Sequence, residues 1–423
     1  MVGPAKEKVL LVGCFRGRDG HVEALESLDE LRLLAQTAGG SVVSAALQER
    51  RTIDPATFIG KGKAEEIGMV CREQAVDLVL FDEDLSPAQA RNLEKLTGVR
   101  VIDRSQLILD IFALGARTSV ARAQVELAQL EYMLPRLTRM WEHLSRTGGG
   151  IGTRGPGETQ LEVDRRRIRR RIFTLKRVLK KVEQDHVVRT ARRKDFPKAS
   201  LVGYTNAGKS TLFNQLARAN VATGNRLFET LDTTTRLVKL PSRESILLSD
   251  TVGFIRKLPH HLVASFHATL ECVVEADLVV HVADISHPNH EAQIATVRSV
   301  LGELGAGSKP EILILNKIDC VSNGGELRRA LRIYEDAVPM SALTGSGLDA
   351  LADRLLKFVT EPKREVLVRF PRSDDRTFSY IQKYGKVLAS EVVDGDFRLS
   401  IRMDRKLLKS IEAYVESGPE KQA

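Results

Sequence analysis

The chain has 423 residues and a formal net charge of +9, and at roughly 150 residues per domain this length predicts about three domains. It contains no run of about 18 apolar residues and no apolar targeting segment at its N-terminus, so we do not expect a membrane span. Its four cysteines include no CxxC pair, which argues against a disulfide framework or a cysteine metal site and favours the reducing cytoplasm.

Residues 1–115 have the pattern of a separate α/β domain. Short apolar runs at residues 9–12, 41–45, 78–81 and 99–102 predict strands, and helical patterns at 23–35 and 64–74 lie between them. The segment FIGKGK, residues 58–63, lacks the GxxxxGK spacing of a phosphate-binding loop. We therefore predict a surface turn there in preference to a second nucleotide site.

Residues 116–197 predict a long antiparallel helical hairpin. Apolar residues recur at helical spacing in two stripes, which favours two helices packed stripe against stripe. The stripes comprise Leu127, Leu130, Leu134, Leu137, Trp141 and Leu144, and then Ile168, Ile172, Leu175, Val178, Leu179 and Val182. Pro135 marks a kink in the first helix. The connecting segment, residues 147–160, contains six glycines and is expected to be an exposed loop at the tip.

The positive charge of the chain is concentrated in the second helix of this hairpin. Residues 165–198 contain 15 Lys and Arg against 3 acidic residues, a net charge of +12, so the remaining chain carries −3. Charged helix faces are usually only solvated, and a plain basic spacer is one interpretation. Because few acidic residues offset this positive charge, and because it lies next to a glycine-rich tip, contact with a nucleic acid is favoured instead. The candidate RNA-binding residues are Arg154, Arg165, Arg166, Arg169 and Arg170.

Residues 198–360 begin with a phosphate-binding loop. GYTNAGKS, residues 203–210, fits G-x-x-x-x-G-K-[ST] and lies between an apolar run at 199–202 and a helical pattern at 211–217, as the motif requires. Gly203 and Gly208 let the backbone turn tightly around phosphate oxygens. Lys209 is expected to reach the β- and γ-phosphates, and the Ser210 hydroxyl to ligate Mg²⁺.

Two further motifs stand at the ends of apolar runs in this region. Runs at 246–249, 278–283 and 312–315 alternate with helical patterns, which predicts a mainly parallel sheet with its ligands at the carboxyl ends of the strands. DTVG, residues 250–253, and NKID, residues 316–319, follow two of these runs. The Asp319 carboxylate can accept from two adjacent N–H groups of guanine but not from adenine, a preference on the order of 10⁴-fold. The motifs together predict a GTP site, and NKID argues against a metabolic P-loop kinase.

Residues 361–423 predict a small α+β domain of the order βαββα. Residues 366–370 form a strand, 387–393 and 397–403 form a hairpin through Asp394-Gly395, and a final helix follows from Arg405. The expected fold is therefore α/β: a P-loop GTPase domain preceded by an α/β domain with a long helical hairpin and followed by a small α+β domain.

The combination of motifs resembles one family. GYTNAGKS, LFETLDTTTR (residues 227–236), DTVGFIRKLP (250–259) and NKID, preceded by FIGKGK and GGGIGTRGPGETQLE (148–162), are similar to those of the HflX family in the Obg–HflX superfamily of translational P-loop GTPases. The resemblance covers about the whole chain except the tail, and GPGETQLE is its most specific part. It implies a GTPase that binds the large ribosomal subunit and its rRNA, directs the hairpin tip at the peptidyl-transferase region and splits stalled ribosomes. We expect a cytoplasmic protein, partly ribosome-associated and monomeric when free.

The residues expected to bind the nucleotide lie in five segments. They are Gly203, Tyr204, Thr205, Asn206, Ala207, Gly208, Lys209, Ser210, Phe228, Glu229, Thr230, Leu231, Asp232, Asp250, Thr251, Val252, Gly253, Asn316, Lys317, Ile318, Asp319, Ser341, Ala342 and Leu343. Asn316 and Asp319 would read the guanine, and Lys317 would pack along the base. Backbone groups of residues 341–343 would contact the guanine oxygen, although Ser341 also suits a loop or a helix cap.

Mg²⁺ and the catalytic groups are expected beside the phosphates. Ser210 and one threonine would ligate the ion, and Asp250 would hold it through a water. From the residues alone Thr230, Thr233, Thr234 and Thr235 all qualify, and the resemblance favours Thr230. Lys209 would neutralise charge between the β- and γ-phosphates, and the Gly253 N–H would contact the γ-phosphate.

Phe254 stands where Ras-like GTPases have the glutamine that orients the attacking water. A phenyl ring cannot bind that water, so we expect slow hydrolysis by the protein alone and completion of the site by a partner or an ion. Asn206 resembles the asparagine of potassium-stimulated GTPases, and we expect it to help bind K⁺. The alternative is an asparagine that only stabilises the turn.

Two functions remain open at this point. The first is a GTPase that remodels or splits ribosomes. The second is a regulatory GTPase switch that recruits a protein partner, with the hairpin serving only as a scaffold. The basic stripe and the GPGETQLE segment favour the first.

Overall fold

The chain was analysed as a computed structural model that describes most of its length. The described residues are 6–137, 156–191, 196–217, 228, 234–241, 244–257, 267–321, 324–360, 364–393, 395–403 and 405–417. The chain divides into two compact units, Met1–Ala352 and Asp353–Ala423. None of the described helices is long and apolar enough to cross a membrane.

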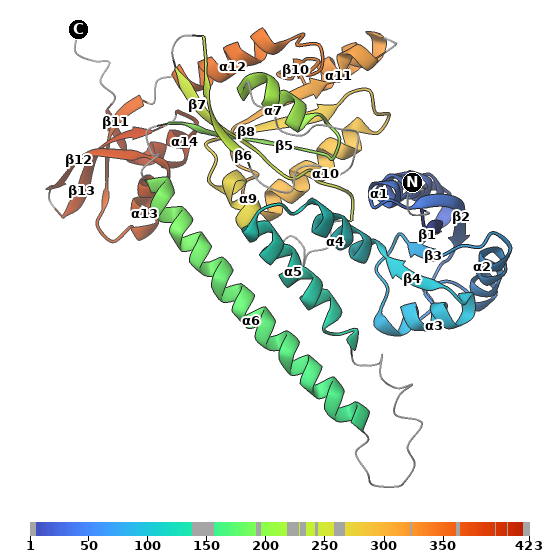
Figure 1. The fold of residues 1–423 in the computed structure, drawn as a ribbon. Coiled ribbons are helices and arrows are strands. Elements are labelled where there is room, and N and C mark those ends of the chain that lie inside the picture. Colours follow the sequence, from blue (N-terminus) through green and yellow to red (C-terminus); the bar gives the residue numbers. More distant parts are fainter. Residues whose placement is uncertain are drawn as a thin grey trace. The chain divides into compact units, whose positions relative to one another are not determined.

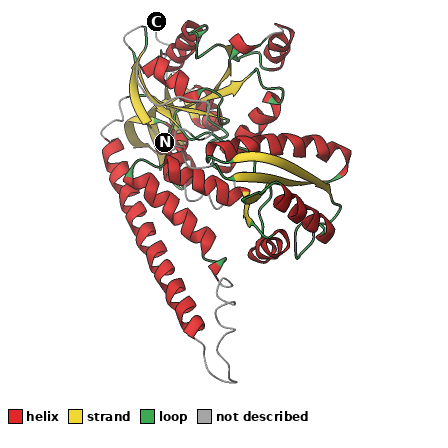
Figure 2. Ribbon diagram, turned by 45° about the vertical axis from the view of Figure 1, so that its right-hand side comes forward, coloured by secondary structure: helices red, strands yellow, loops and turns green. Residues whose placement is uncertain are grey.

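The N-terminal part of the first unit is a parallel sheet covered on both faces (Figure 2). Its strands are β1 (Lys8–Phe15), β2 (Ser41–Glu49), β3 (Leu78–Phe81) and β4 (Arg100–Asp103), in the order β2-β1-β3-β4. Helices α1 (Gly17–Thr37), α2 (Lys61–Glu73) and α3 (Pro87–Thr97) connect them. Val9 and Leu11 pack into one core while Leu10 and Val12 pack into another, since successive side chains of a strand face opposite sides. All four strands lie where the apolar runs predicted them.

The FIGKGK segment is more deeply buried than predicted. Phe58 is 6% exposed and Ile59 is fully buried in the core between the sheet, α2 and α3. Gly60 caps the N-terminus of α2, and the two lysines lie on its first turn. The prediction of a surface turn was therefore wrong: the segment anchors α2 to the sheet.

The helical hairpin is present, with α5 and α6 lying side by side and antiparallel (Figure 1). Helix α4 (Arg104–Gly115) leads into α5 (Ser119–Met133). Leu134 still has helical backbone angles, φ −52° and ψ −47°, but Pro135 has no N–H to donate to the next helical hydrogen bond, so the helix ends here. Helix α6 (Pro156–Ala191) is the second arm. Its Leu175 is buried, but Val178 is 46% exposed and does not belong to the seam as predicted. Leu144 and Trp141 of the first stripe lie outside the described residues.

The second sheet has six strands in the order β10-β9-β8-β5-β7-β6. They are β5 (Lys198–Gly203), β6 (Thr234–Lys239), β7 (Ser245–Asp250), β8 (Leu278–Asp284), β9 (Glu311–Asn316) and β10 (Val338–Pro339). The helices are α7 (Lys209–Ala217), α9 (His267–Val274), α10 (His290–Glu303), α11 (Gly324–Ile333) and α12 (Leu348–Thr360). Only β6 pairs antiparallel, with β7. The strand order reverses around β5, which is where ligands bind in such sheets.

The C-terminal unit has an antiparallel sheet of the order β12-β13-β11-β14. Its elements are β11 (Arg364–Pro371), α13 (Asp375–Tyr384), β12 (Lys386–Val393), β13 (Asp396–Met403), α14 (Arg405–Leu408) and β14 (Val415–Ser417). The predicted βαββ order and hairpin are present. The last helix is only four residues long, continues as a 3-10 helix, Lys409–Tyr414, and precedes a fourth strand that was not predicted.

Candidate nucleotide-binding site

The phosphate-binding loop connects β5 to α7 and holds its lysine inward. Lys209 is 5% exposed, and its Nζ donates to the carbonyl oxygens of Gly203 (3.1 Å) and Tyr204 (2.8 Å). Burial lowers the pKa of Lys209 to about 8. Gly208 has φ +97°, and a side chain there would collide with the Asn316 amide, so this position requires glycine. The loop thus places the Lys209 ammonium group beneath a backbone that can wrap around a phosphate.

Oxygen groups converge beside this loop. The Ser210 hydroxyl donates to Asp250 Oδ2 at 2.8 Å, and Asp250 is 1% exposed at the end of β7. Asp250 Oδ1 is buried and has no hydrogen-bond partner among the described residues, as is also true of Thr205 Oγ1. Burial raises the pKa of Asp250. A buried carboxylate oxygen that lacks a partner, next to a hydroxyl, fits the oxygen ligands that Mg²⁺ prefers.

The DTVG segment lies directly against the loop. A Cβ at Gly253 would lie 2.8 Å from Thr205 Cα and 3.0 Å from Lys209 Nζ, so only glycine fits. The Thr205 N–H donates to the Phe254 carbonyl (2.8 Å), and the Phe254 N–H donates to the Gly203 carbonyl (3.1 Å). These bonds hold the backbone of Gly253 beside the lysine, where its N–H was expected.

Asn316 joins three of the predicted segments. It is 2% exposed at the end of β9; its Nδ2 donates to the Ala207 carbonyl (2.7 Å), and its Oδ1 accepts from the Ala342 N–H (2.8 Å). The Ala342 amide is thus already engaged, so a contact from it to a base would be shared with Asn316. Leu343 is 75% exposed, and Ser341 is buried.

The remaining NKID side chains lie at the surface of the same edge. Asp319 is exposed, and its pKa is lowered chiefly by a hydrogen bond from Ser341. Lys317 adopts φ +64° and pairs with Asp284 at the end of β8. An exposed carboxylate beside a serine, at the end of a strand, can accept from a base that stacks over Lys317.

The other predicted residues lie in several different settings. Asn206 is exposed at φ +61°, a conformation that asparagine tolerates, which accords with a role in the turn. Thr251 donates from Oγ1 to the Leu201 carbonyl (2.6 Å), and Val252 packs against the core of the N-terminal sheet. Ile318 begins a short 3-10 helix. Glu229, Thr230, Leu231, Asp232 and Arg154 lie outside the described residues.

The side chain of Phe228 lies in a hydrophobic core. Its ring is 6% exposed and packs edge-to-face on Phe112 of α4, with centroids 4.7 Å apart. Ile255, which follows DTVGF, belongs to the same core. Residues of both predicted nucleotide-binding segments are thus anchored in the N-terminal core, so a contact of Phe228 with the nucleotide would come from its backbone.

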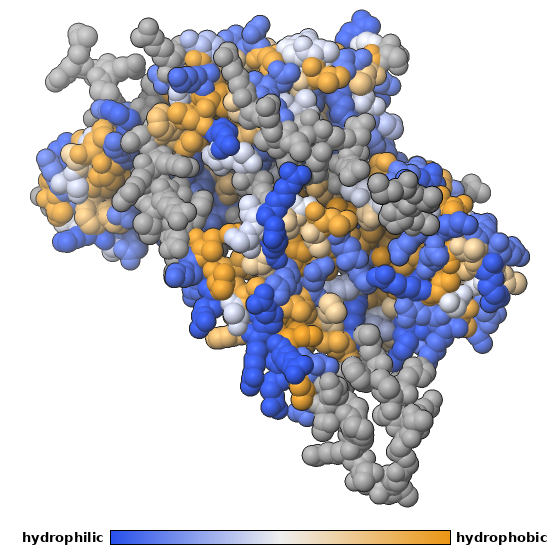
Figure 3. Space-filling model, viewed as in Figure 1, coloured by the Kyte–Doolittle hydropathy of each residue, from blue (hydrophilic) through white to orange (hydrophobic). Residues whose placement is uncertain are grey.

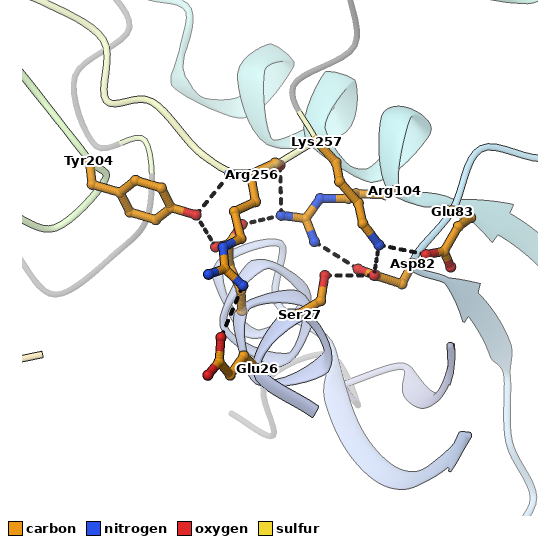
Figure 4. A network of polar contacts seen from close by, with 9 residues as sticks. Glu26, Ser27, Asp82, Glu83, Arg104, Tyr204, Arg256 and Lys257 are labelled. Carbon is orange, nitrogen blue, oxygen red and sulfur yellow. Dashed lines mark hydrogen bonds and ion pairs between the residues drawn. The ribbon is translucent and has the colours of Figure 1, made fainter. Parts of the chain in front are cut away.

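A polar network, absent from the sequence predictions, strengthens this anchorage (Figure 4). The Tyr204 hydroxyl of the phosphate loop donates to Glu30 of α1 and accepts from the Arg256 N–H at 2.8 Å. Arg256 also pairs with Glu26 (3.0 Å). Helix α1 thus holds the side chain of Arg256 directly, and it holds the Arg256 backbone N–H through Tyr204 of the phosphate loop.

Arg104 lies at the centre of the network. Its side chain is 2% exposed; it donates to Asp82 (2.8 Å), to Glu30 and to the Arg256 carbonyl (3.1 Å). Burial alone would lower the pKa of Arg104, but the charges of Glu30 and Asp82 outweigh it and raise this pKa. Lys257 pairs with Asp82 and Glu83, and Asp82 also accepts from the Ser27 hydroxyl at 2.6 Å. The residues of this network follow no spacing that a sequence motif would have, so the network itself could not be predicted from the sequence. The apolar runs beside them predicted only the strands that hold them.

The phosphate loop lies where the strand order reverses, and Gly253 of DTVG packs against its Lys209. Asn316 of NKID bonds to the same loop from the end of β9. Together these features define a P-loop GTPase domain. Three family models match the chain: GTP-binding GTPase N-terminal over residues 25–113, GTP-binding GTPase Middle Region over 115–193, and 50S ribosome-binding GTPase over 198–317. The chain belongs to the HflX family of GTPases, and it binds and hydrolyses GTP.

Individual relatives support this membership over nearly the whole chain. The chain is 44% identical over 390 residues to GTPase HflX of Caldanaerobacter subterraneus subsp. tengcongensis, covering 91% of the chain and 88% of the relative. It is 42% identical over 422 residues to GTPase HflX of Escherichia coli, covering 97% and 98%. Among solved structures, it is similar to a GTP-binding protein from the archaeon Sulfolobus solfataricus in complex with GDP, with 24% identity, a TM-score of 0.44 and coverage of 84% and 99%.

Proposed function

We propose that this GTPase binds the large ribosomal subunit through its rRNA and uses GTP to remodel or split stalled ribosomes. The observation that carries the proposal is the division of charges on α6. Arg171 pairs with Glu126 (2.6 Å) and Lys176 pairs with Glu131 (2.8 Å), and both thereby hold α6 to α5. Arg165, Arg166, Arg169 and Arg170 make no ion pair with any described carboxylate. Four such arginines on one face provide the electrostatic footprint of a polyanion.

Two further observations favour a ribosomal target. The family model matched by residues 198–317 is described as a 50S ribosome-binding GTPase. Helix α4, which leads into the hairpin, carries Phe112, and this ring packs on Phe228 of a segment expected beside the phosphates. A change at the nucleotide therefore has a packed route to the base of the hairpin, as coupling between a nucleotide site and a remodelling element requires.

The chemical roles follow from the contacts beside the phosphate loop. Lys209 would exchange its carbonyl partners for the β- and γ-phosphates, and the Gly253 N–H would contact the γ-phosphate. Ser210 and Asp250, with Thr230, would hold Mg²⁺, which would supply positive charge at the phosphate oxygens. Asp319 would accept from guanine, and Asn206 would assist a potassium ion near the β- and γ-phosphates.

Hydrolysis by the free protein is proposed to be slow. The Phe254 ring is 2% exposed and lies in a core with Val202, Tyr204 and Val273, so it faces away from solvent and offers no group to orient water. The large subunit would then act as the activator. We further propose four functional regions, residues 1–115, 116–197, 198–360 and 361–423, in a cytoplasmic protein that is monomeric when free and partly ribosome-associated.

Cosedimentation with purified large subunits in a non-hydrolysable GTP analogue tests the function. The parent should pellet with subunits, increasingly so as salt falls, and the variant with Arg165, Arg166, Arg169 and Arg170 replaced by Ala should show a flatter salt dependence with unchanged GTP affinity. Deleting residues 149–157 should spare most binding yet abolish subunit splitting. If the arginine variant keeps the parent's salt dependence and ribosome-stimulated GTPase rate, the hairpin is a scaffold, and the protein-recruiting switch is the better function.

A further inference from the structure

A groove on α6 combines positive charge with an exposed aromatic ring. It has a volume of about 870 Å³, and the residues lining it include Arg165, Arg166, Arg169, Arg170 and Phe173, with Glu162 as the one acid among the described lining residues. Figure 3 shows hydrophilic residues gathered over this part of α6. The groove is separate from the nucleotide site and its polar network.

Phe173 is not part of the hairpin's packing. Its side chain is 69% exposed, whereas Leu175, two residues later, is 4% exposed and packs in the seam. Leaving most of a phenyl ring in water forgoes much of the hydrophobic stabilisation that its burial would contribute to folding. The ring therefore contributes little to the stability of the hairpin, and its face is accessible to a ligand of the groove.

The arginines and the ring form one continuous surface. Residues four apart lie above one another on a helix, so Arg165, Arg169 and Phe173 make one row, and Arg166 and Arg170 make the adjacent row. At 1.5 Å per residue the row extends for about 12 Å. The salt bridges of Arg171 and Lys176 to α5 fix the orientation of this face away from the seam.

We propose that this groove binds RNA at an unpaired nucleotide, whose base stacks on Phe173 while the arginines neutralise the neighbouring phosphates. In a duplex the faces of the bases are already stacked and out of reach, so an exposed ring can engage only a base in a loop, bulge or single strand. Every base has a π-face, so the contact requires no particular sequence. The proposal rests on the RNA-binding function above and adds the form of RNA that the surface selects.

Charge and stacking make separable contributions, which the experiment exploits. The full-length protein is titrated into labelled stem–loop RNA with an adenine-rich loop, and into a fully paired duplex with the same number of phosphates, across a salt series. Phe173→Ala should weaken binding of the stem–loop by roughly 5- to 100-fold at every salt concentration. It should leave the salt slope and duplex binding unchanged, because no charge is removed. The Arg165→Ala, Arg166→Ala, Arg169→Ala, Arg170→Ala variant should flatten the slope for both RNAs.

Two controls distinguish stacking from loss of structure. Val178→Ala removes another exposed apolar side chain of α6 and should bind both RNAs like the parent. Phe173→Trp should retain stem–loop affinity, and its fluorescence should be quenched by the stem–loop but not by the duplex. If Phe173→Ala binds the stem–loop like the parent, or weakens both RNAs equally, the stacking proposal is overturned while RNA binding stands. If the parent itself binds neither RNA nor large subunits, the proposed function fails.

Discussion

Replacing Arg104 by methionine tests how strongly the N-terminal sheet holds the segment after DTVGF. Removing one partner of a buried ion pair typically costs about 3–5 kcal/mol, because the other charge stays buried. Here Asp82 keeps Lys257 and the Ser27 hydroxyl, and Glu30 keeps Tyr204, so the lower end, about 3 kcal/mol, is expected. That corresponds to roughly a 10²-fold loss of the protection of backbone amides against hydrogen exchange.

Hydrogen exchange measures this loss locally, which matters because a chain with several domains does not unfold in one step. Amides of α1 and α4 should exchange roughly 10²-fold faster in Arg104→Met, and amides of the C-terminal sheet should be unchanged. Because Arg104 also holds the Arg256 carbonyl, the segment beside Gly253 loses support and must be ordered by the nucleotide. The affinity for GTP relative to GDP should therefore fall by roughly 2- to 10-fold.

Arg136→Met is the matched control. Arg136 pairs with Asp103 (3.1 Å) and lies over the Tyr132 ring, in the same part of the fold but without contact to Arg256. It should lower local protection yet leave the GTP to GDP preference unchanged. Parental exchange rates in Arg104→Met, or an equal change of nucleotide preference in both variants, would refute the reasoning.

Three further predictions concern the nucleotide site itself. Asp319→Asn should weaken GTP by roughly 10²-fold or more and favour xanthine nucleotides, measured by fluorescent-nucleotide titration; equal GTP affinity would exclude Asp319 as the guanine acceptor. Since burial sets the pKa of Lys209 at about 8 and bound phosphates would raise it, GTP binding should take up a proton and weaken by up to about tenfold per unit as pH rises above 8. Calorimetry in two buffers of different ionisation enthalpy measures that uptake, and its absence above pH 8 contradicts the linkage. Asn206→Ala should abolish any stimulation of turnover by potassium over sodium, and identical parental rates in the two salts, with and without ribosomes, reject a potassium site.

The sequence predicted those parts of the fold that have a local pattern. The buried parallel strands appeared as continuous apolar runs, and the glycine–lysine loop and NKID have spacings fixed by their backbone geometry. Strand β6 was not predicted because it is a short, partly polar edge segment in which Val238 is buried and Leu237 is exposed, without the continuous apolar run of the central strands. Val178 was misplaced because helical spacing relates it to the buried Leu175, but spacing alone does not show which of the apolar residues are covered.

The contacts around Arg104 could not be predicted for a different reason. Arg256 and Glu26 are 230 residues apart, and Tyr204 and Glu30 are 174 apart, so no periodicity relates them. Charged residues such as these look like ordinary surface residues in a sequence. The packing of Phe228 was not predicted either, because a motif position indicates where the backbone lies but not which core its side chain enters.

The packing of Phe254 restricts which substitutions this position can accept. Its ring is buried beside Val202 and Val273, and its backbone is bonded to Gly203 and Thr205 at the start of the phosphate loop. A glutamine at this position would carry an amide into an apolar core, where an unpaired polar group costs about 1–3 kcal/mol. A single substitution therefore cannot readily restore a water-orienting residue here, because the gain in chemistry would be coupled to a loss of packing. The outside activator that we propose would then be hard to replace by mutation, because the position that could supply the missing group belongs to the hydrophobic core.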